Sequence, residues 1–177
     1  MFELGSCVVY GIHGVCRVIG KEKQLVDRKR AEYLVLEPIG QNESRFYLPA
    51  ANPIAMAKLK QVLSKKELEN LISSNEVHVD CWIPEENLRK QRYRELISGG
   101  DRTALLQMVH TLYQHRQIQL VAGRKVHLCD ENFLRDAERL VAGETAMVMS
   151  LEPEEAKQYI RAKLKEDALD CSCKNGQ

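Results

Sequence analysis

The period of the hydrophobic pattern changes once along this chain, near residue 54. Before that point the apolar residues form short β-prone runs that end at glycines or prolines, at residues 7–10, 15–19, 31–37 and 45–48. Such runs predict four or five short strands in a small, curled antiparallel sheet or barrel. The glycines between them fall where tight corners need a permissive backbone.

After residue 54 the apolar residues recur at intervals of three and four, which is typical of amphipathic helices. The segment Ser64-Lys65-Lys66-Glu67 has the spacing of a capping box. Further helix starts are indicated at Pro84, Asp101, Asp130 and Pro153. We therefore predict an α+β chain: a β module over residues 1–53, an all-helical domain over 58–168 and a flexible tail over 169–177.

The charge of the chain is nearly balanced. It has 26 Lys and Arg against 25 Asp and Glu, a formal net charge of +1. Any contact with DNA must therefore come from a local patch, and such a protein suits recruitment by a partner better than an unaided search for DNA. The first residues lack the pattern of a signal peptide and no segment has the length of a membrane span, so we expect a cytoplasmic protein with no membrane contact.

Motifs of common enzymes do not occur in the sequence, neither phosphate-binding glycine loops nor nucleophile elbows. His13 and Cys16 are close enough in sequence to suggest a nucleophile pair. However, His13 falls in a predicted turn and Cys16 in a predicted strand, where a small hydrophobic residue packs well. Glu85 and Glu86 fit the dipole at a helix start better than acid–base catalysis. We expect a protein that is not an enzyme.

Neither a metal site nor a cofactor is expected. The six cysteines contain no C-x-x-C pair and are predicted to be reduced thiols in a cytosolic chain. No metal-ligand spacing links three histidines of the helical half, His110, His115 and His127.

Trp82 is the only tryptophan, and it precedes a predicted helix that carries a run of cations. These cations are Arg89, Lys90, Arg92 and Arg94. Minor-groove proteins combine an apolar wedge with cations that hold phosphates. A lone tryptophan also serves often as a core filler, and the residues alone leave both interpretations open.

Helical spacing limits how many of these cations are available to DNA. Apolar residues from Leu88 to Ile97 form a broad arc, and Arg89 and Arg92 fall within or beside it. One of them is expected to lie along packed surface or to pair with Glu85 or Glu86. Two or three of the four cations are therefore available as phosphate ligands.

The two halves together resemble the CarD/CdnL transcription regulators of bacteria over nearly the whole chain. The β half carries Phe2-x-x-Gly5-x-x-Val8-Val9-Tyr10-x-x-His13-Gly14, Tyr33-Leu34-Val35-Leu36 and Tyr47-Leu48-Pro49. The helical half carries Trp82, Arg89-x-x-Arg92-Tyr93, Ser98-Gly99-Gly100-Asp101, Leu112-Tyr113 and Ala137-Glu138-Arg139-Leu140. The order and spacing of these pieces make the resemblance specific.

The resemblance implies a Tudor/SH3-like module that binds the RNA polymerase β subunit, partly by strand pairing, and a helical domain that contacts DNA. The DNA contact would lie at the upstream edge of the promoter −10 element, with Trp82 as the wedge and Arg89, Lys90 and Arg92 in the basic turn beside it. Arg94, from the same run of cations, completes the predicted DNA-binding set. Such a protein would act as a monomer and stabilise the open promoter complex without reading a specific sequence.

The polymerase-facing residues implied by the same resemblance lie in the β half. They are Gln24, Val26, Arg28, Arg45 and Tyr47. Gln24 and Tyr47 stand where some relatives carry arginines, which leaves Arg28, Arg45 or backbone pairing to supply the contact. The acidic segment Asp130-Glu131-Asn132 also departs from some relatives, so the DNA contact would rest on the Trp82 turn.

Two other functions remain open from the sequence. One is an adaptor that binds RNA polymerase and makes no DNA contact, with Trp82 buried between helices. The other belongs to the enzyme or redox class and would need a thiol of low pKa.

Overall fold

The computed structural model describes residues 2–26, 29–40 and 44–174, with side chains for all of these except residues 26, 29 and 166–174. The chain divides into two compact units, residues 1–62 and 63–177. The first unit is an antiparallel sheet and the second is helical, so the predicted α+β class is confirmed. In the part of the chain that the structure describes, no helix is both long and apolar enough to cross a bilayer.

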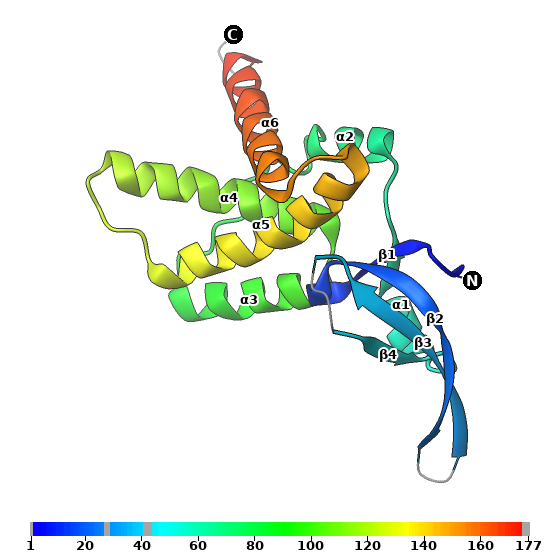
Figure 1. The fold of residues 1–177 in the computed structure, drawn as a ribbon. Coiled ribbons are helices and arrows are strands. Elements are labelled where there is room, and N and C mark those ends of the chain that lie inside the picture. Colours follow the sequence, from blue (N-terminus) through cyan, green and yellow to red (C-terminus); the bar gives the residue numbers. More distant parts are fainter. Residues whose placement is uncertain (1, 27–28, 41–43, 175–177) are drawn as a thin grey trace. The chain divides into compact units, whose positions relative to one another are not determined.

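The first unit is one five-stranded sheet in the order β4-β3-β2-β1-β5, with all neighbours antiparallel (Figure 1). Its strands are β1 (Cys7–Tyr10), β2 (Val15–Val26), β3 (Lys29–Pro38), β4 (Phe46–Pro49) and β5 (Leu59–Gln61). A 3-10 turn (Gly11–His13) joins β1 to β2, and the short helix α1 (Pro53–Ala57) precedes β5.

Two parts of this sheet differ from the sequence prediction. The strand expected to end at Gly20 continues to Val26, because a register shift between Val18 and Gly20 absorbs the irregularity without breaking the ladder with β3. β5 pairs with β1 although it lies beyond the predicted end of the β module at residue 53. A strand of three residues is too short to display an alternating pattern. The sequence therefore predicted the helical period of the neighbouring residues here and not a strand.

The core of the sheet comes from alternating residues on one face, since side chains of a strand point to opposite faces in turn. Leu34 and Leu36 of β3 are buried, and Leu48 of β4 stands opposite Leu34 in the register. The buried cluster consists of Val8, Cys16, Val18, Leu34, Leu36, Leu48 and Leu59. Burial of these apolar side chains is the main force that closes so small a sheet.

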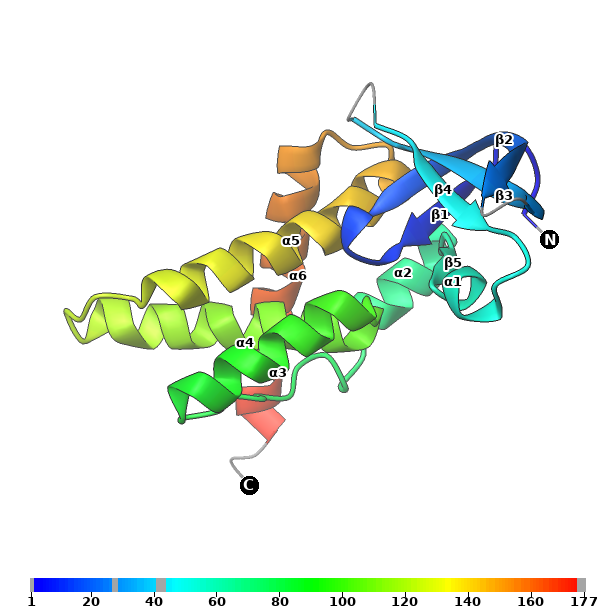
Figure 2. The same cartoon turned by 90° about the horizontal axis from the view of Figure 1, so that it is seen from below.

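The second unit contains five helices: α2 (Lys65–Ile72), α3 (Glu86–Gly99), α4 (Arg102–Val121), α5 (Leu128–Met149) and α6 (Pro153–Lys174). α4 and α5 form an antiparallel pair, and α6 crosses this pair (Figures 1 and 2). The tail predicted at residues 169–177 is helical as far as Lys174, and residues 175–177 lie outside the described part.

The ends of these helices follow the capping chemistry of the sequence. Ser64 and Glu67 form both bonds of the predicted capping box. The Asp101 side chain accepts the backbone N–H of Ala104 and caps α4. Gly100 ends α3 in the left-handed region with φ of 59°, where glycine has no steric penalty.

Helix α5 holds the second unit together through three buried carboxylates. Each pairs with an arginine from a different helix: Asp130 with Arg89 of α3, Glu138 with Arg161 of α6, and Glu144 with Arg102 of α4. In all three pairs two guanidinium nitrogens reach two carboxylate oxygens, at distances between 2.7 and 3.1 Å. Such two-point pairing fixes geometry, so these pairs specify how the helices pack around α5.

Candidate functional site

Trp82 lies in the connection between α2 and α3, and hydrogen bonds tie this connection to α4. The backbone N–H of Cys81 donates to Oγ1 of Thr111 at 3.0 Å. The backbone N–H of Trp82 donates to Oδ1 of Asp80 at 3.0 Å. Trp82 packs against the helical core and is half-buried, so part of its indole stays exposed to solvent.

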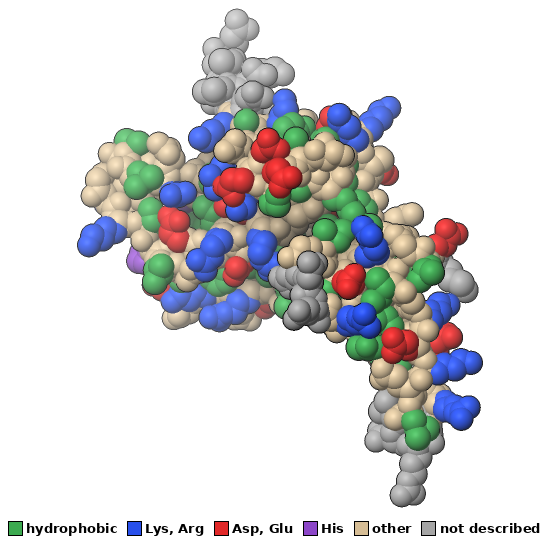
Figure 3. Space-filling view, viewed as in Figure 1, with side chains coloured by type: hydrophobic (Ala, Val, Ile, Leu, Met, Phe, Trp, Pro, Cys, Tyr) green, Lys and Arg blue, Asp and Glu red, His purple; other side chains and the backbone are tan. Residues whose placement is uncertain are grey.

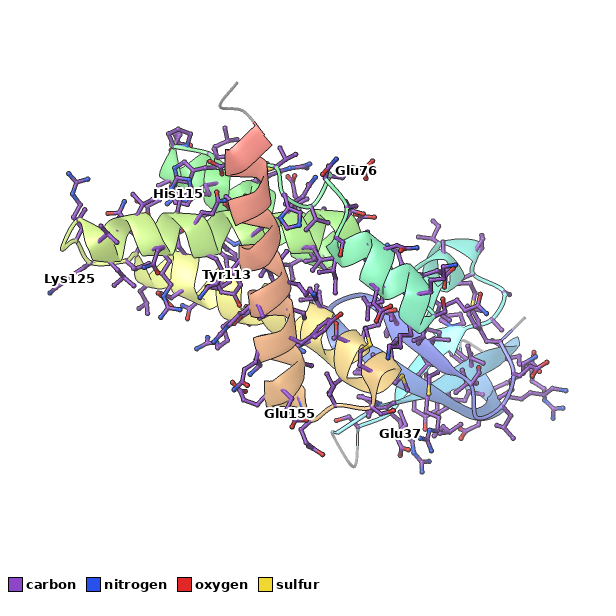
Figure 4. The ribbon with its side chains drawn as sticks, turned by 90° about the horizontal axis from the view of Figure 1, so that it is seen from above. Glu37, Glu76, Tyr113, His115, Lys125 and Glu155 are labelled. Carbon is purple, nitrogen blue, oxygen red and sulfur yellow. The ribbon has the colours of Figure 1, made fainter. Side chains whose placement is uncertain are left out.

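Two planar groups contact the indole of Trp82. The imidazole of His115 stacks on it, with ring centroids 3.8 Å apart and planes 13° apart. The guanidinium carbon of Arg89 lies over the ring, 4.3 Å from its centroid. Nε2 of His115 lies 3.4 Å from Oδ2 of Asp80. Asp80 therefore contacts both the His115 ring that stacks on the indole and the backbone N–H of Trp82. Figure 4 shows His115 on α4 and Lys125 at the end of the α4–α5 pair.

Arg89 is enclosed by the protein, with 3% of its side chain exposed. Nε and Nη2 donate to the two oxygens of Asp130, and Nη1 donates to the carbonyls of Ile83 at 2.9 Å and Pro84 at 3.3 Å. Burial alone would lower the pKa of Arg89, but the hydrogen bonds and charge of Asp130 outweigh it and raise that pKa. The guanidinium that was predicted to hold DNA is therefore engaged internally, and its partner is Asp130 rather than Glu85 or Glu86.

The other predicted cations lie on the surface of α3. Lys90 pairs with Glu86 at 2.5 Å and holds the pKa of that carboxyl below its usual range. Arg92 and Glu95 form an exposed pair at 3.4 Å. Arg94 is exposed, and no ion pair is found for it within the described residues. On the face drawn in Figure 3, Lys and Arg side chains lie over α3 and α5.

A cavity of about 180 Å³ opens beside the indole. Its lining includes Trp82, Arg89, His115, His127 and Asp130. Sequence reasoning missed the roles of His115 and Asp130. His115 contacts Trp82, and Asp130 contacts Arg89, across more than thirty residues of sequence. A hydrophobic period describes only neighbouring residues, so it cannot predict such contacts.

His13 and Cys16, which the sequence suggested as a nucleophile pair, are both packed against other side chains. Burial, with a smaller contribution from Cys7, raises the pKa of the Cys16 thiol to about 11. His13 instead lies against aromatic rings, with its centroid 4.1 Å from that of Phe46 and 5.1 Å from that of Tyr10. A thiol with a raised pKa is a weak nucleophile near neutral pH.

Strand β4 lies at one edge of the sheet, and its register shows which backbone groups point outward. The N–H of Ala50 donates to the carbonyl of Glu32 at 2.9 Å, which makes these two residues a hydrogen-bonded pair. Hydrogen-bonded and non-hydrogen-bonded pairs alternate along an antiparallel ladder. Tyr47, opposite Val35, is therefore in a non-hydrogen-bonded pair, and its N–H and C=O point away from β3.

Gln24 and Tyr47, two of the predicted polymerase-facing residues, share a face of the sheet. Gln24 stands opposite Ala31, and Tyr47 stands opposite Val35, four residues further along β3. This face is the one opposite the apolar core, and Tyr47 is 40% exposed on it. Arg45 is exposed just before β4. The side chain of Val26 and the whole of Arg28 lie outside the described residues.

Comparison with known families agrees with this architecture. Residues 2–60 match the model of the CarD-like/TRCF RID domain. The sheet is a CarD-type RNA-polymerase-interacting domain. The match ends within β5, so the RID domain covers β1 to β4 and part of β5, and it leaves the helical unit unassigned. No curated protein matches the chain. The RID domain gives the chain a role in transcription that involves RNA polymerase.

Proposed function

We propose that this chain is a non-enzymatic transcription regulator that docks on the RNA polymerase β subunit and stabilises the open promoter complex. The RID domain supplies the attachment to polymerase. The helical unit contacts DNA at the upstream edge of the −10 element without reading its sequence. The observation that carries the DNA part is Trp82, a partly exposed side chain held in place beside α3.

The edge of β4 supports docking by strand addition. Tyr47 directs its backbone N–H and C=O outward, and an extended segment of a partner could pair with both groups. Its side chain is exposed on the same strand. Edge strands of this kind are templates for pairing with another chain, and here the partner would be a strand of the β subunit.

The stacking around Trp82 bears on how it would act on DNA. His115 stacks on the indole and Arg89 lies over the ring, so full insertion between two bases would require these side chains to move. An indole that caps the last base pair of the opening bubble would need only its exposed part. We therefore favour capping at the fork, with Lys90, Arg92 and Arg94 near the backbone phosphates.

The test is the substitution Trp82→Ala in the full chain, with Trp82→Phe as the matched aromatic control. Trp82→Ala should leave polymerase binding unchanged and shorten the open-complex half-life by about fivefold or more, because base–aromatic stacking contributes about 1–3 kcal/mol. Trp82→Phe should retain part of the effect. An unaltered half-life in Trp82→Ala would remove the DNA contact from the proposal.

A second candidate is an adaptor that binds polymerase and makes no DNA contact. It is favoured by the internal use of the Trp82 surroundings, in which Arg89 and His115 both contact the indole. Substituting Lys90 and Arg94 together by glutamate separates the two functions. The regulator would lose its effect on the open complex, whereas the adaptor would keep it.

A further inference from the structure

The guanidinium of Arg89 links three parts of the helical unit that are distant in sequence. It belongs to α3, it is paired with Asp130 in the first turn of α5, and it donates to the carbonyls of Ile83 and Pro84 next to Trp82. Its carbon also lies over the indole. Within the described residues, every hydrogen bond of this side chain is therefore made to Asp130 or to the segment that carries Trp82.

Among the described residues, Asp130 is the carboxylate that balances this buried cation. Its side chain is 6% exposed, and both of its oxygens accept from Arg89. Without that charge the guanidinium would be buried and uncompensated, a strongly unfavourable state. It would then turn toward solvent, and the two carbonyls and the ring would lose their partner.

We propose that Asp130 is a positioning residue for Trp82 and acts through Arg89. This inference rests on the proposed function for its biological meaning, because the orientation of the indole matters where it meets melted DNA. The geometric part stands apart from that function: the Arg89–Asp130 pair sets how far the indole is exposed and which of its faces is covered.

The first measurement uses Trp82 as the only tryptophan of the chain. In the full-length Asp130→Asn variant, indole emission should shift to the red and quenching by acrylamide should increase. Arg89→Lys should have the same effect, because an ammonium cannot bond the carboxylate and the two carbonyls as the planar fork does. The double variant should equal either single one, since both act through one contact.

The matched control is Glu144→Gln. It removes another two-point pair of the same helix, between Glu144 and Arg102, whose carboxylate is also 6% exposed. This variant should lose thermal stability as Asp130→Asn does, while Trp82 emission and quenching stay as in the parent. If both variants change the tryptophan signals alike, or if Asp130→Asn changes neither signal, the pair is a general packing element and the inference is wrong.

The second measurement is the open-complex half-life. Asp130→Asn should shorten it in the direction of Trp82→Ala, with polymerase binding unchanged and with no effect of Glu144→Gln. A Trp82→Ala variant without effect on half-life would overturn the proposed function, and the quenching result would still decide the positioning role. A shortened half-life in Trp82→Ala with a parental half-life in Asp130→Asn would overturn only the positioning role.

Discussion

Arg89 and Arg94 lie five residues apart on the same helix, and their surroundings give them opposite uses. Arg89 is buried and bonded on three nitrogens, so phosphate could reach it only after the loss of a buried ion pair, which costs about 3–5 kcal/mol when one partner is removed. Arg94 is exposed. A phosphate contact at Arg94 requires no such loss. At the residue scale, the neighbours of a cation decide its role more than its charge.

The buried side chain of His110 predicts how the stability of the fold depends on pH. It is 2% exposed, and burial, followed by the charge of His78, lowers its pKa, while Asp80 acts weakly in the opposite direction. The folded protein therefore takes up this proton less readily than the unfolded chain. Stability should fall as pH drops below about 6.5, the pKa of an unperturbed histidine, by up to about 1.4 kcal/mol per pH unit.

The measurement is urea unfolding between pH 7.5 and pH 5 for the parent and for His110→Leu. Above the unfolded pKa the His110 ring is neutral in both the folded and the unfolded state, so the variant should differ there only by packing and by the lost hydrogen bond between His110 and Gln114. Below it, the stability of His110→Leu should decline less steeply than that of the parent. Equal slopes in parent and His110→Leu would contradict this prediction.

Among the elements, the long helix α5 is fixed inside its unit, whereas the short strand β4 lies at the edge of its sheet. α5 is fixed by apolar burial and by three ion pairs to three helices. Among the strands of the described residues, β4 pairs with β3 alone, which leaves the outward groups of Tyr47 for a partner. The sheet thus keeps its core closed with a strand that can still extend the sheet into another protein.

This division predicts different effects for two substitutions at Tyr47. Tyr47→Pro removes both the tyrosine side chain and the outward N–H, and it leaves the ladder with β3 intact because edge strands tolerate proline at such positions. Affinity for a polymerase β fragment should fall by about threefold to tenfold for the lost hydrogen bond alone. Tyr47→Ala removes only the side chain and should have the smaller effect if backbone pairing dominates.

The measurement is the affinity of each variant for an immobilised polymerase β fragment, and a thermal melt of each variant checks that the sheet is folded. Leu48→Pro is the control for the position along the strand. Leu48 is in a hydrogen-bonded pair with Leu34, so a proline there removes a hydrogen bond to β3 and should destabilise the sheet itself. If Tyr47→Pro and Tyr47→Ala lose the same affinity, the contact is made by the side chain and strand addition is wrong.

The elements also show where the sequence carried enough information. The capping box at Ser64 and Glu67, the Asp101 cap and the glycine end at Gly100 are local signals, and the structure has all three. β5 was missed because three residues hold no period, and its pairing with β1 spans about fifty residues. The helical period predicted Arg89 within or beside the apolar arc, and it is buried, but its partner Asp130 is 41 residues away in sequence.

For the whole molecule, the distribution of charge separates the two units. Residues 1–62 carry nine Lys and Arg against six Asp and Glu, so residues 63–177 carry 17 against 19. The helical unit therefore has a net charge of −2, although it holds the residues proposed to contact DNA. Several of its arginines are used in pairs with buried carboxylates and add little to an electrostatic footprint. Such a unit has little general attraction for a polyanion.

This charge balance predicts that the full chain binds free DNA poorly and acts only when polymerase holds it. Anisotropy with a labelled promoter duplex at physiological salt should show a dissociation constant weaker than about 10⁻⁴ M, the weak end of non-specific binding. Polymerase-bound protein would meet the same DNA at a high effective concentration, so weak contacts would suffice. Tyr47→Pro should accordingly reduce the effect on open-complex half-life although Trp82 is intact, and excess protein should restore it by refilling the polymerase site. Micromolar or tighter binding of the chain to free duplex would contradict delivery by polymerase, and would mean that the cations of α3 outweigh the acidic balance of their unit.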